Sequence, residues 1–225
     1  MEVVMLLLYL PKNNIMLITK TTHISHNKVW LNDQVVYQQE PESNFQDFIK
    51  PAFKELCTPY PKFYKMDSLS KLAYVASEVL LKDTDLLSKY SKEEIGLVFL
   101  NSTSTINTDR EHQKSVSGRA NYFPSPAIFV YTLPNIMLGE ICIKNGFFGE
   151  NLLLVSEKFD AEMLHRQVKQ LHESQRLQAC ITGWVDIDED NYQAFIMLAE
   201  SDSIVDNSKE FCTFDVATIE KLFNR

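Results

Sequence analysis

Three apolar runs, separated by segments with helical periodicity, constrain the fold of this chain more than any other feature of its sequence. The runs span residues 95–100, 151–155 and 178–187. Uninterrupted runs of this kind are typical of strands that are buried on both faces of a sheet. Such a sheet needs a helical layer on each face, so the sequence predicts an α/β fold.

Two helices are predicted before the first run. Residues 68–82 place leucine, alanine and valine on one face, and Asp67 or Ser68 is positioned to cap that helix. Residues 45–56 have the same spacing, but Pro51 is expected to kink the helix or to restart it.

The second half of the chain alternates in the same way. Helices are predicted over residues 134–146 and 160–173, and a fourth buried strand is predicted over residues 192–199. The turn at residues 188–191 is short enough to join the last two strands as a hairpin. Residues 101–123 are predicted to form a long polar loop.

The two ends of the chain add smaller elements. Residues 28–37 suggest two short strands around an Asn-Asp turn, and residues 211–214 suggest a strand followed by a short helix to Arg225. The predicted order is therefore βαβαβαββ. It gives a mixed, mainly parallel sheet with helices on both faces and one antiparallel strand from the hairpin.

The composition is that of one ordinary globular domain. With 225 residues the chain can bury a single core, and we expect residues 1–225 to form one domain. A net charge of −8 disfavours binding to a phosphate backbone, so no nucleic-acid partner is expected. The 4 cysteines are widely spaced, which fits a reducing, cytoplasmic protein better than a disulfide-bonded one.

The first residues need an interpretation of their own. The apolar part of MEVVMLLLYLPKNNI is too short to span a bilayer, and the stretch has neither the basic start nor the cleavage site of a signal peptide. Residues 1–15 are expected to be either an extension ahead of a true start at Met16 or an extra edge strand. No membrane partner is predicted.

The candidate chemistry lies at the turn between the second apolar run and the helix that follows it. Enzymes often place a nucleophile at such a turn, and here its residues are Ser156, Glu157, Lys158 and Phe159. Ser156 lacks the flanking glycines of a nucleophile elbow and is expected to end the strand or to cap the helix. His112 lies among acidic residues of the predicted loop, where a solvated position is favoured over a catalytic His–acid pair.

No cofactor and no metal site are predicted. The sequence has no glycine-rich phosphate loop. Glu162 and His165 have the spacing of a di-metal ligand pair, but the sequence offers no second copy. The acidic turn at residues 186–190 lacks the glycine and the final carboxylate of a calcium loop.

Four stretches of the chain together resemble a known family. They are MDSLSKLAYVASEVLL followed by IGLVFLN, the TLPNIMLGE segment, Gly149-Glu150-Asn151 leading into LLLVSEKF, and ACITGWVD. In order and spacing they are similar to the N-terminal half of the β-ketoacyl synthases of the thiolase superfamily, over residues 64–200. The resemblance implies a thiolase-like half in which the strand at residues 151–155 precedes the nucleophile.

The resemblance also implies that the chemistry of the family is missing. In active synthases the condensing cysteine follows the glycine that matches Gly149 by about nine residues, which leads to Lys158 or, with a shift of one residue, to Glu157. Neither can form a thiolate that accepts an acyl chain. The two catalytic histidines of the family belong to a C-terminal repeat beyond this chain, and His165 and His172 lie instead on the helix after the turn.

The resulting hypothesis is a non-catalytic β-ketoacyl synthase-like subunit for acyl assembly of the fatty-acid, polyketide or aryl-polyene type. It is similar in logic to chain-length factors, which are cysteine-less partners of an active synthase. It is also similar to the small synthase-like proteins of aryl-polyene and flexirubin-type pathways. One alternative is an acyl or malonyl transferase or decarboxylase that uses Lys158, Ser156 or His112. Another is a structural homodimer without an acyl ligand.

Partners follow from the same resemblance. In the family, one strand pairs across a two-fold axis, which implies a homodimer or a heterodimer with an active β-ketoacyl synthase. The matching residues are Asn151, Leu152, Leu153, Leu154 and Val155. A missing second repeat is also expected to leave apolar surface uncovered. An acyl carrier protein is expected to bind weakly, because the chain is acidic and its compact basic group is only Lys158, Arg166 and Lys169.

Overall fold

The computed structural model of the chain describes residues 15–117, 124–203, 205 and 211–225. One mixed sheet of eight strands runs through these residues in the order β3-β2-β1-β7-β6-β4-β5, with β8 paired to the start of β1. The strands are β1 (Met16–Ser25), β2 (Lys28–Leu31), β3 (Gln34–Gln38), β4 (Ile95–Asn101), β5 (Asn151–Val155), β6 (Ala179–Asp188), β7 (Asn191–Ser201) and β8 (Cys212–Thr213). The stretch VVMLLLYL, expected to be an extension or an edge strand, lies outside the described residues.

The strand directions confirm the predicted mixed sheet. β4 pairs in parallel with β5 and β6, whereas the ladders β6–β7, β7–β1, β1–β2 and β2–β3 are antiparallel. Five of the seven strands along this path, β1, β3, β4, β5 and β6, therefore point the same way. The predicted order βαβαβαββ is present, with β1 as its first strand and the β2–β3 hairpin as an addition.

The first strand corrects the prediction, because the sequence pattern places the earliest strands at residues 28–37. β1 is ten residues long and reads MLITKTTHIS. Its register toward β7 shifts between Ile18 and Lys20, so Thr19 forms a β-bulge. A bulge interrupts the period-two alternation, which hides the strand from a search for a regular pattern.

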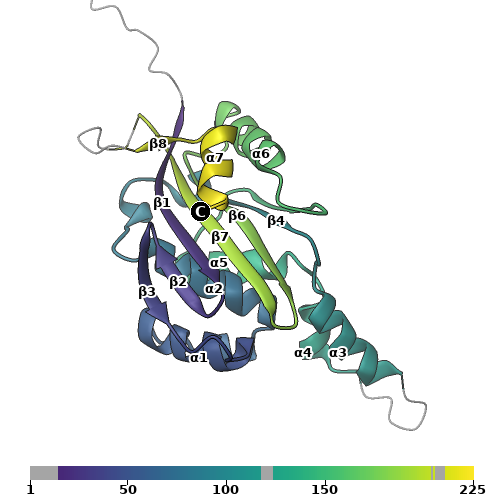
Figure 1. Cartoon of the computed structure of the whole chain (residues 1–225). Coiled ribbons are helices and arrows are strands. Elements are labelled where there is room, and N and C mark those ends of the chain that lie inside the picture. The colour runs from purple at the N-terminus through teal and green to yellow at the C-terminus, as the bar shows by residue number, and fades with distance from the viewer. Residues whose placement is uncertain (1–14, 118–123, 204, 206–210) are drawn as a thin grey trace, which may run out of the picture.

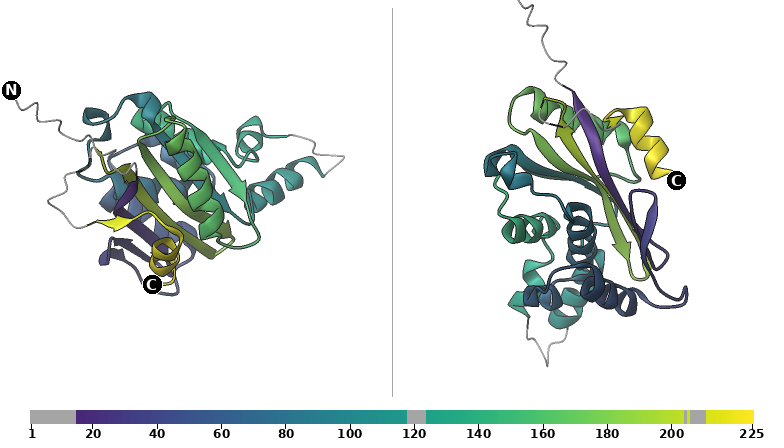
Figure 2. Two further views of the ribbon diagram at one scale, coloured as in Figure 1. Left: turned by 90° about the horizontal axis from the view of Figure 1, so that it is seen from above. Right: turned by 90° about the vertical axis from the view of Figure 1, so that its left-hand side faces the viewer.

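Helices cover both faces of the sheet, as predicted (Figure 2). One layer consists of α1 (Phe45–Leu56), α2 (Ser68–Leu81) and α5 (Ile136–Asn145), and the other of α6 (Ala161–Glu173) and α7 (Val216–Phe223). Alternate side chains of β4 serve the two layers, Phe99 on the first and Val98 on the second. β4 is consequently buried along its whole length.

Two of the expected helix signals act as predicted. Asp67 caps α2 by accepting a hydrogen bond from the Ser70 N–H at 2.9 Å. Gly146 ends α5 in the left-handed region at φ 72°. α1, however, is assigned as one helix through Pro51, so the helix does not restart there.

Residues 101–117, the described part of the segment predicted to be a polar loop, are instead largely helical. They contain α3 (Ile106–Val116), which packs against α4 (Pro126–Val130) in an arm that projects from the body of the molecule (Figure 1). Thr108 is the only buried residue of α3. A helix without an apolar face gives no periodic signal in the sequence.

β5 is an edge strand and not a buried one, which corrects a second prediction. Among the described strands it pairs only with β4. Its three leucines are half-buried, and Asn151 and Val155 are exposed. An apolar run shows that a strand can be buried, but the position of the sheet edge depends on strand order.

The sheet face that carries α6 is covered more completely than expected. α7 and β8 lie beside α6, and Phe214 and Ile219 join the core beneath them. Among the described residues, the most exposed large apolar side chains are Ile143 of α5, Phe148 before β5 and Val155 at the end of β5, which are 67%, 66% and 61% exposed.

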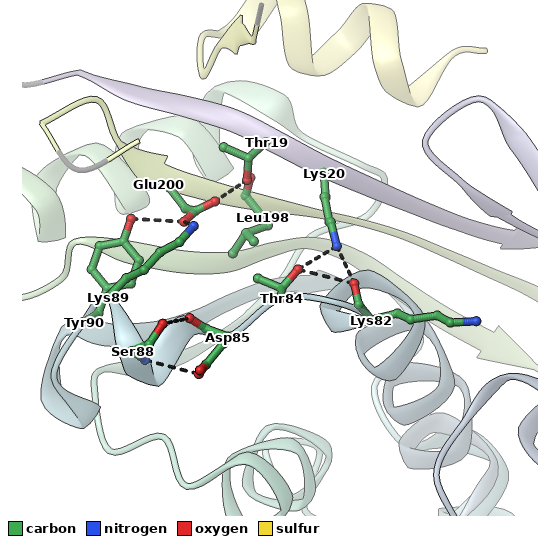
Figure 3. A network of polar contacts seen from close by, with 10 residues as sticks. All are labelled: Thr19, Lys20, Lys82, Thr84, Asp85, Ser88, Lys89, Tyr90, Leu198 and Glu200. Carbon is green, nitrogen blue, oxygen red and sulfur yellow. Dashed lines mark hydrogen bonds and ion pairs between the residues drawn. The ribbon is translucent and has the colours of Figure 1, made fainter. Parts of the chain in front are cut away.

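A buried carboxylate fastens β1 to the sheet at the end where β4 and β6 begin (Figure 3). Glu200, near the end of β7, is only 3% exposed. It accepts hydrogen bonds from the hydroxyl of Thr19 in the β-bulge and from the Tyr90 hydroxyl at 3.1 Å, and the Lys89 ammonium lies 3.3 Å away. Burial, together with the Glu200 carboxylate, raises the pKa of Tyr90, so its hydroxyl remains a donor.

Candidate functional site

Two hydrogen bonds to the backbone hold the turn between β5 and α6. The Ser156 N–H donates to the Asn101 carbonyl at 2.9 Å, and the Ser102 hydroxyl donates to the Glu157 carbonyl at 3.2 Å. Ser156 therefore ends the strand, as expected. The alternative that it caps α6 is wrong, because the cap is Asp160, which accepts from the Met163 N–H at 2.8 Å.

A second set of polar contacts fixes the neighbouring turn after β4. Asp186 accepts hydrogen bonds from the backbone N–H groups of Ser102 at 3.0 Å and Thr103 at 2.8 Å. The Asn101 amide donates to the Val185 carbonyl at 2.7 Å. Asp186 thus positions the chain at the carboxyl end of the parallel strands. The structure gives it this role in place of a calcium loop.

These two turns border a cleft of about 510 Å³. Its lining residues are Ser102, Glu157, Lys158, Phe159, Ala161, Trp184, Asp186, Gln193, Glu220, Phe223 and Asn224. Glu157 and Lys158 are exposed. Three carboxylates and one ammonium among the lining residues make the cleft acidic.

An aromatic cluster closes the inner side of the cleft. Phe159 stacks on Phe223 of α7, with ring centroids 3.9 Å apart and an interplanar angle of 16°. The rings of Trp184 and Phe195 are each nearly perpendicular to the ring of Phe159, with ring centroids 6.2 Å from it. These four rings come from four separate segments, so no local pattern in the sequence could have placed α7 at the turn.

No thiol is available at this turn. All 4 cysteines lie in the described residues, none is in a disulfide, and none lines the cleft. Burial raises the pKa of Cys142 and Cys180, and burial followed by the charge of Glu78 raises the pKa of Cys57 to about 12. Cys212 is exposed but belongs to β8.

The structure does not bring the candidate histidines to the cleft. His112 lies on α3, where its ring packs 5.6 Å from Phe129. His165 and His172 lie on α6, the first near Phe214 and the second buried, with Nδ1 3.1 Å from the Leu177 carbonyl. In the part of the chain that the structure describes, no group of three or more His, Cys, Asp or Glu residues could hold a metal ion. Nor is any helix there long and apolar enough to cross a bilayer.

No family model matches the chain, and no curated protein matches it. Solved structures do match. The ishigamide ketosynthase/chain length factor aligns with 85% of this chain and 63% of its own length, with a TM-score of 0.64 and 13% identity.

Two further structures agree. The complex of the ketosynthase ApeO with its chain length factor ApeC from Xenorhabdus doucetiae matches with a TM-score of 0.53 and 15% identity, over 83% of this chain and 79% of that one. The complex AntDE:AntF, a type II PKS acyl-carrier protein with its ketosynthase, matches with a TM-score of 0.56 and 10% identity, over 84% and 63%.

The fold is that of the ketosynthases. The likeness covers more of the chain than the residues 64–200 that carry the sequence resemblance. The chain spans 63% of the length of the ishigamide protein. At these identities the likeness concerns the ketosynthase fold alone.

Proposed function

We propose that this chain is a non-catalytic ketosynthase-like subunit that serves acyl assembly by pairing with a second protein of the same fold. The observation that carries the proposal is that no thiol lines the cleft at the β5–α6 turn, where the family resemblance puts Lys158 or, with a shift of one residue, Glu157 at the nucleophile position. Condensation needs a thiolate to hold the growing chain. A lysine could accept an acyl group only as an amide, which is too stable to pass it on.

A single substitution tests the assignment of this position. Lys158→Cys places a thiol at the β5–α6 turn, two residues before the Asp160 cap of α6, and the thiolate form of that cysteine is the nucleophile. That thiolate would attack an acyl thioester and release its thiol. In a Cys212→Ser background we expect intact-mass and peptide mass spectrometry to show an acyl group at position 158 of the variant and none on the Lys158 parent.

Two outcomes contradict the proposal. Acylation of the Lys158 parent as fast as of the variant would mean that the chain keeps a transfer chemistry of its own. Failure of the Lys158→Cys variant to accept an acyl group, with its melting temperature unchanged, would mean that position 158 is not equivalent to the nucleophile position.

Pairing is proposed to use the free edge of β5. The strand has no neighbour on its outer side among the described strands, and unpaired strand edges readily accept another strand. Exposed Phe148 lies shortly before β5 in the chain. The Cys142 thiol of α5 contacts Asn151 at 3.3 Å, so α5 packs against the start of β5, and exposed Ile143 is the next residue of α5. Apolar groups that flank an open strand edge favour a protein partner of the same fold, either a second copy or an active synthase.

A carrier protein is proposed as a weak partner at most. Lys158, Arg166 and Lys169 are exposed, but Lys169 already lies 3.8 Å from Glu173. The cleft beside them carries Glu157, Asp186 and Glu220. Binding of an acidic carrier protein to the isolated chain is therefore expected to be weak and to fall with added salt.

A further inference from the structure

A second cavity, of about 330 Å³, lies where α1 and α2 meet the arm formed by α3 and α4. It shares no lining residue with the cleft at the β5–α6 turn. Its walls come from the turn before α2, the first turn of α2 and the inner sides of α3 and α4. They include the side chains of Gln46, Ser68, Asn107 and Tyr131, so the cavity is largely polar.

Lys71 is the unusual residue of this cavity. It lines the cavity from α2 and is only 8% exposed. Among the residues that the structure describes, its ammonium makes no hydrogen bond and no ion pair within 4.0 Å. A lysine whose side chain is buried to this extent is normally paired.

The carboxylates that act on the charge of Lys71 are Asp67 and Glu111. Asp67 accepts from the Ser70 N–H at 2.9 Å through one oxygen and from the Thr108 hydroxyl at 2.9 Å through the other. Glu111 lines the cavity from α3, and its carboxylate lies more than 4.0 Å from the Lys71 ammonium.

Two other features of the cavity wall favour an anion. The N-terminus of the 14-residue helix α2 opens here, and helix N-termini attract anions. Lys65 lines the cavity, and Lys50 is close enough to lower the pKa of Lys71, although burial contributes more. The Asp67 and Glu111 carboxylates, which also line the cavity, act in the opposite direction on that pKa.

We propose that Lys71 is the anchor of a binding site for a small anion, one that carries a carboxylate or a phosphate group. The group would sit between the Lys71 ammonium and the first turn of α2, with the amides of Gln46 and Asn107 available as further donors. The volume is at the lower end of the range for small-molecule sites, so the ligand is small. The inference does not depend on the proposed pairing role.

Thermal unfolding with defined anions tests the proposal. Inorganic phosphate and malonate are the two probes, and sodium chloride at matched ionic strength is the reference. We expect at least one probe to raise the melting temperature of the parent chain beyond the chloride reference, since a ligand that binds the folded state stabilises it. A response to phosphate alone or to malonate alone identifies the preferred group.

The variants Lys71→Met and Lys114→Met make the test specific. Lys71→Met keeps the length of the side chain but removes the charge, so we expect it to lose the anion response and, without ligand, to melt about 2 °C or more above the parent. Lys114 lies on α3, is exposed and does not line the cavity, so Lys114→Met should keep the response.

Several results would overturn the site. They are an anion response that survives Lys71→Met, a response no larger than that to chloride, or a ligand-free Lys71→Met variant that melts below the parent, as expected of a structural lysine. If Lys71→Met does not fold, labelling of the parent with an amine-reactive reagent decides. Phosphate or malonate should slow the reaction of Lys71 at least about threefold, as at two-thirds occupancy or more, and an unchanged rate refutes the proposal.

Discussion

Gly149 brings the start of β5 against the backbone of β4, and the position of Lys158 at the turn is counted from this glycine. A Cβ on Gly149 would lie 2.4 Å from the Ile95 carbonyl oxygen and 2.8 Å from that of Glu93. Because backbone atoms cannot move aside, we expect Gly149→Ala to lower the free energy of unfolding by about 1–3 kcal/mol. Urea unfolding measures this change.

Gly139→Ala is the matched control for that measurement. Gly139 lies in α5, and a Cβ there would meet no atom within 4 Å. Alanine is the better helix former, so this variant should be unchanged or more stable by up to about 1 kcal/mol. An equal loss of stability in both variants would contradict the close approach at Gly149.

His23 gives the stability of the fold a pH dependence whose sign can be worked out. Burial, and then the charge of His26, lower the pKa of His23 from 6.5. Protonation therefore favours the unfolded chain, and the penalty is fully present below the folded pKa and disappears as the pH rises past 6.5. We expect His23→Gln to flatten the increase in unfolding free energy with pH over the range below 6.5. An unchanged slope in a series of urea titrations would count against this.

At the scale of one element, the free edge of β5 makes a prediction about assembly. Successive N–H groups of a strand point to opposite sides of it. The Ser156 N–H bonds to β4, so the N–H of the preceding residue, Val155, points away from β4 toward the free edge. Val155→Pro removes this outward donor and leaves the β4 ladder in place. At micromolar concentration we expect light scattering to give twice the 26.0 kDa chain mass for the parent and a lower mass for Val155→Pro.

Val155→Thr is the control for the edge variant, since it keeps both the N–H and the branched side chain at this exposed position. It should remain dimeric. A parent chain that stays monomeric at micromolar concentration, or a Val155→Pro variant that dimerises as well as Val155→Thr, would show that β5 is not the pairing edge.

At the scale of the whole molecule, the elements that could be predicted from the sequence are those whose pattern is complete within the element. The α2 face and its Asp67 cap, the buried strand β4 and the Gly146 end of α5 are of this kind. α3 was not predictable, because it buries only Thr108 and owes its place to packing against α4. The edge position of β5 was not predictable either, because it depends on which strands lie beside it.

The candidate site, too, could be predicted from the sequence only in part. Lys158 could be located by counting from Gly149, because the chain between them forms one strand and one short turn. The stacking of Phe159 on Phe223 could not be foreseen, since the two residues are separated by β6, β7 and β8. The Lys71 cavity was equally hidden, because Lys71 reads as one polar residue on an otherwise apolar helix.

The claim that this chain does not condense acyl groups is tested most directly by incubating the parent chain with an acyl thioester and a malonyl thioester, followed by mass spectrometry and measurement of released carbon dioxide. We predict no carbon dioxide above the protein-free reaction and no acyl group bound through a thioester, because no thiol lies at the β5–α6 turn. A hydroxylamine-labile acyl group on any of Cys57, Cys142, Cys180 or Cys212, together with a condensed product, would contradict it.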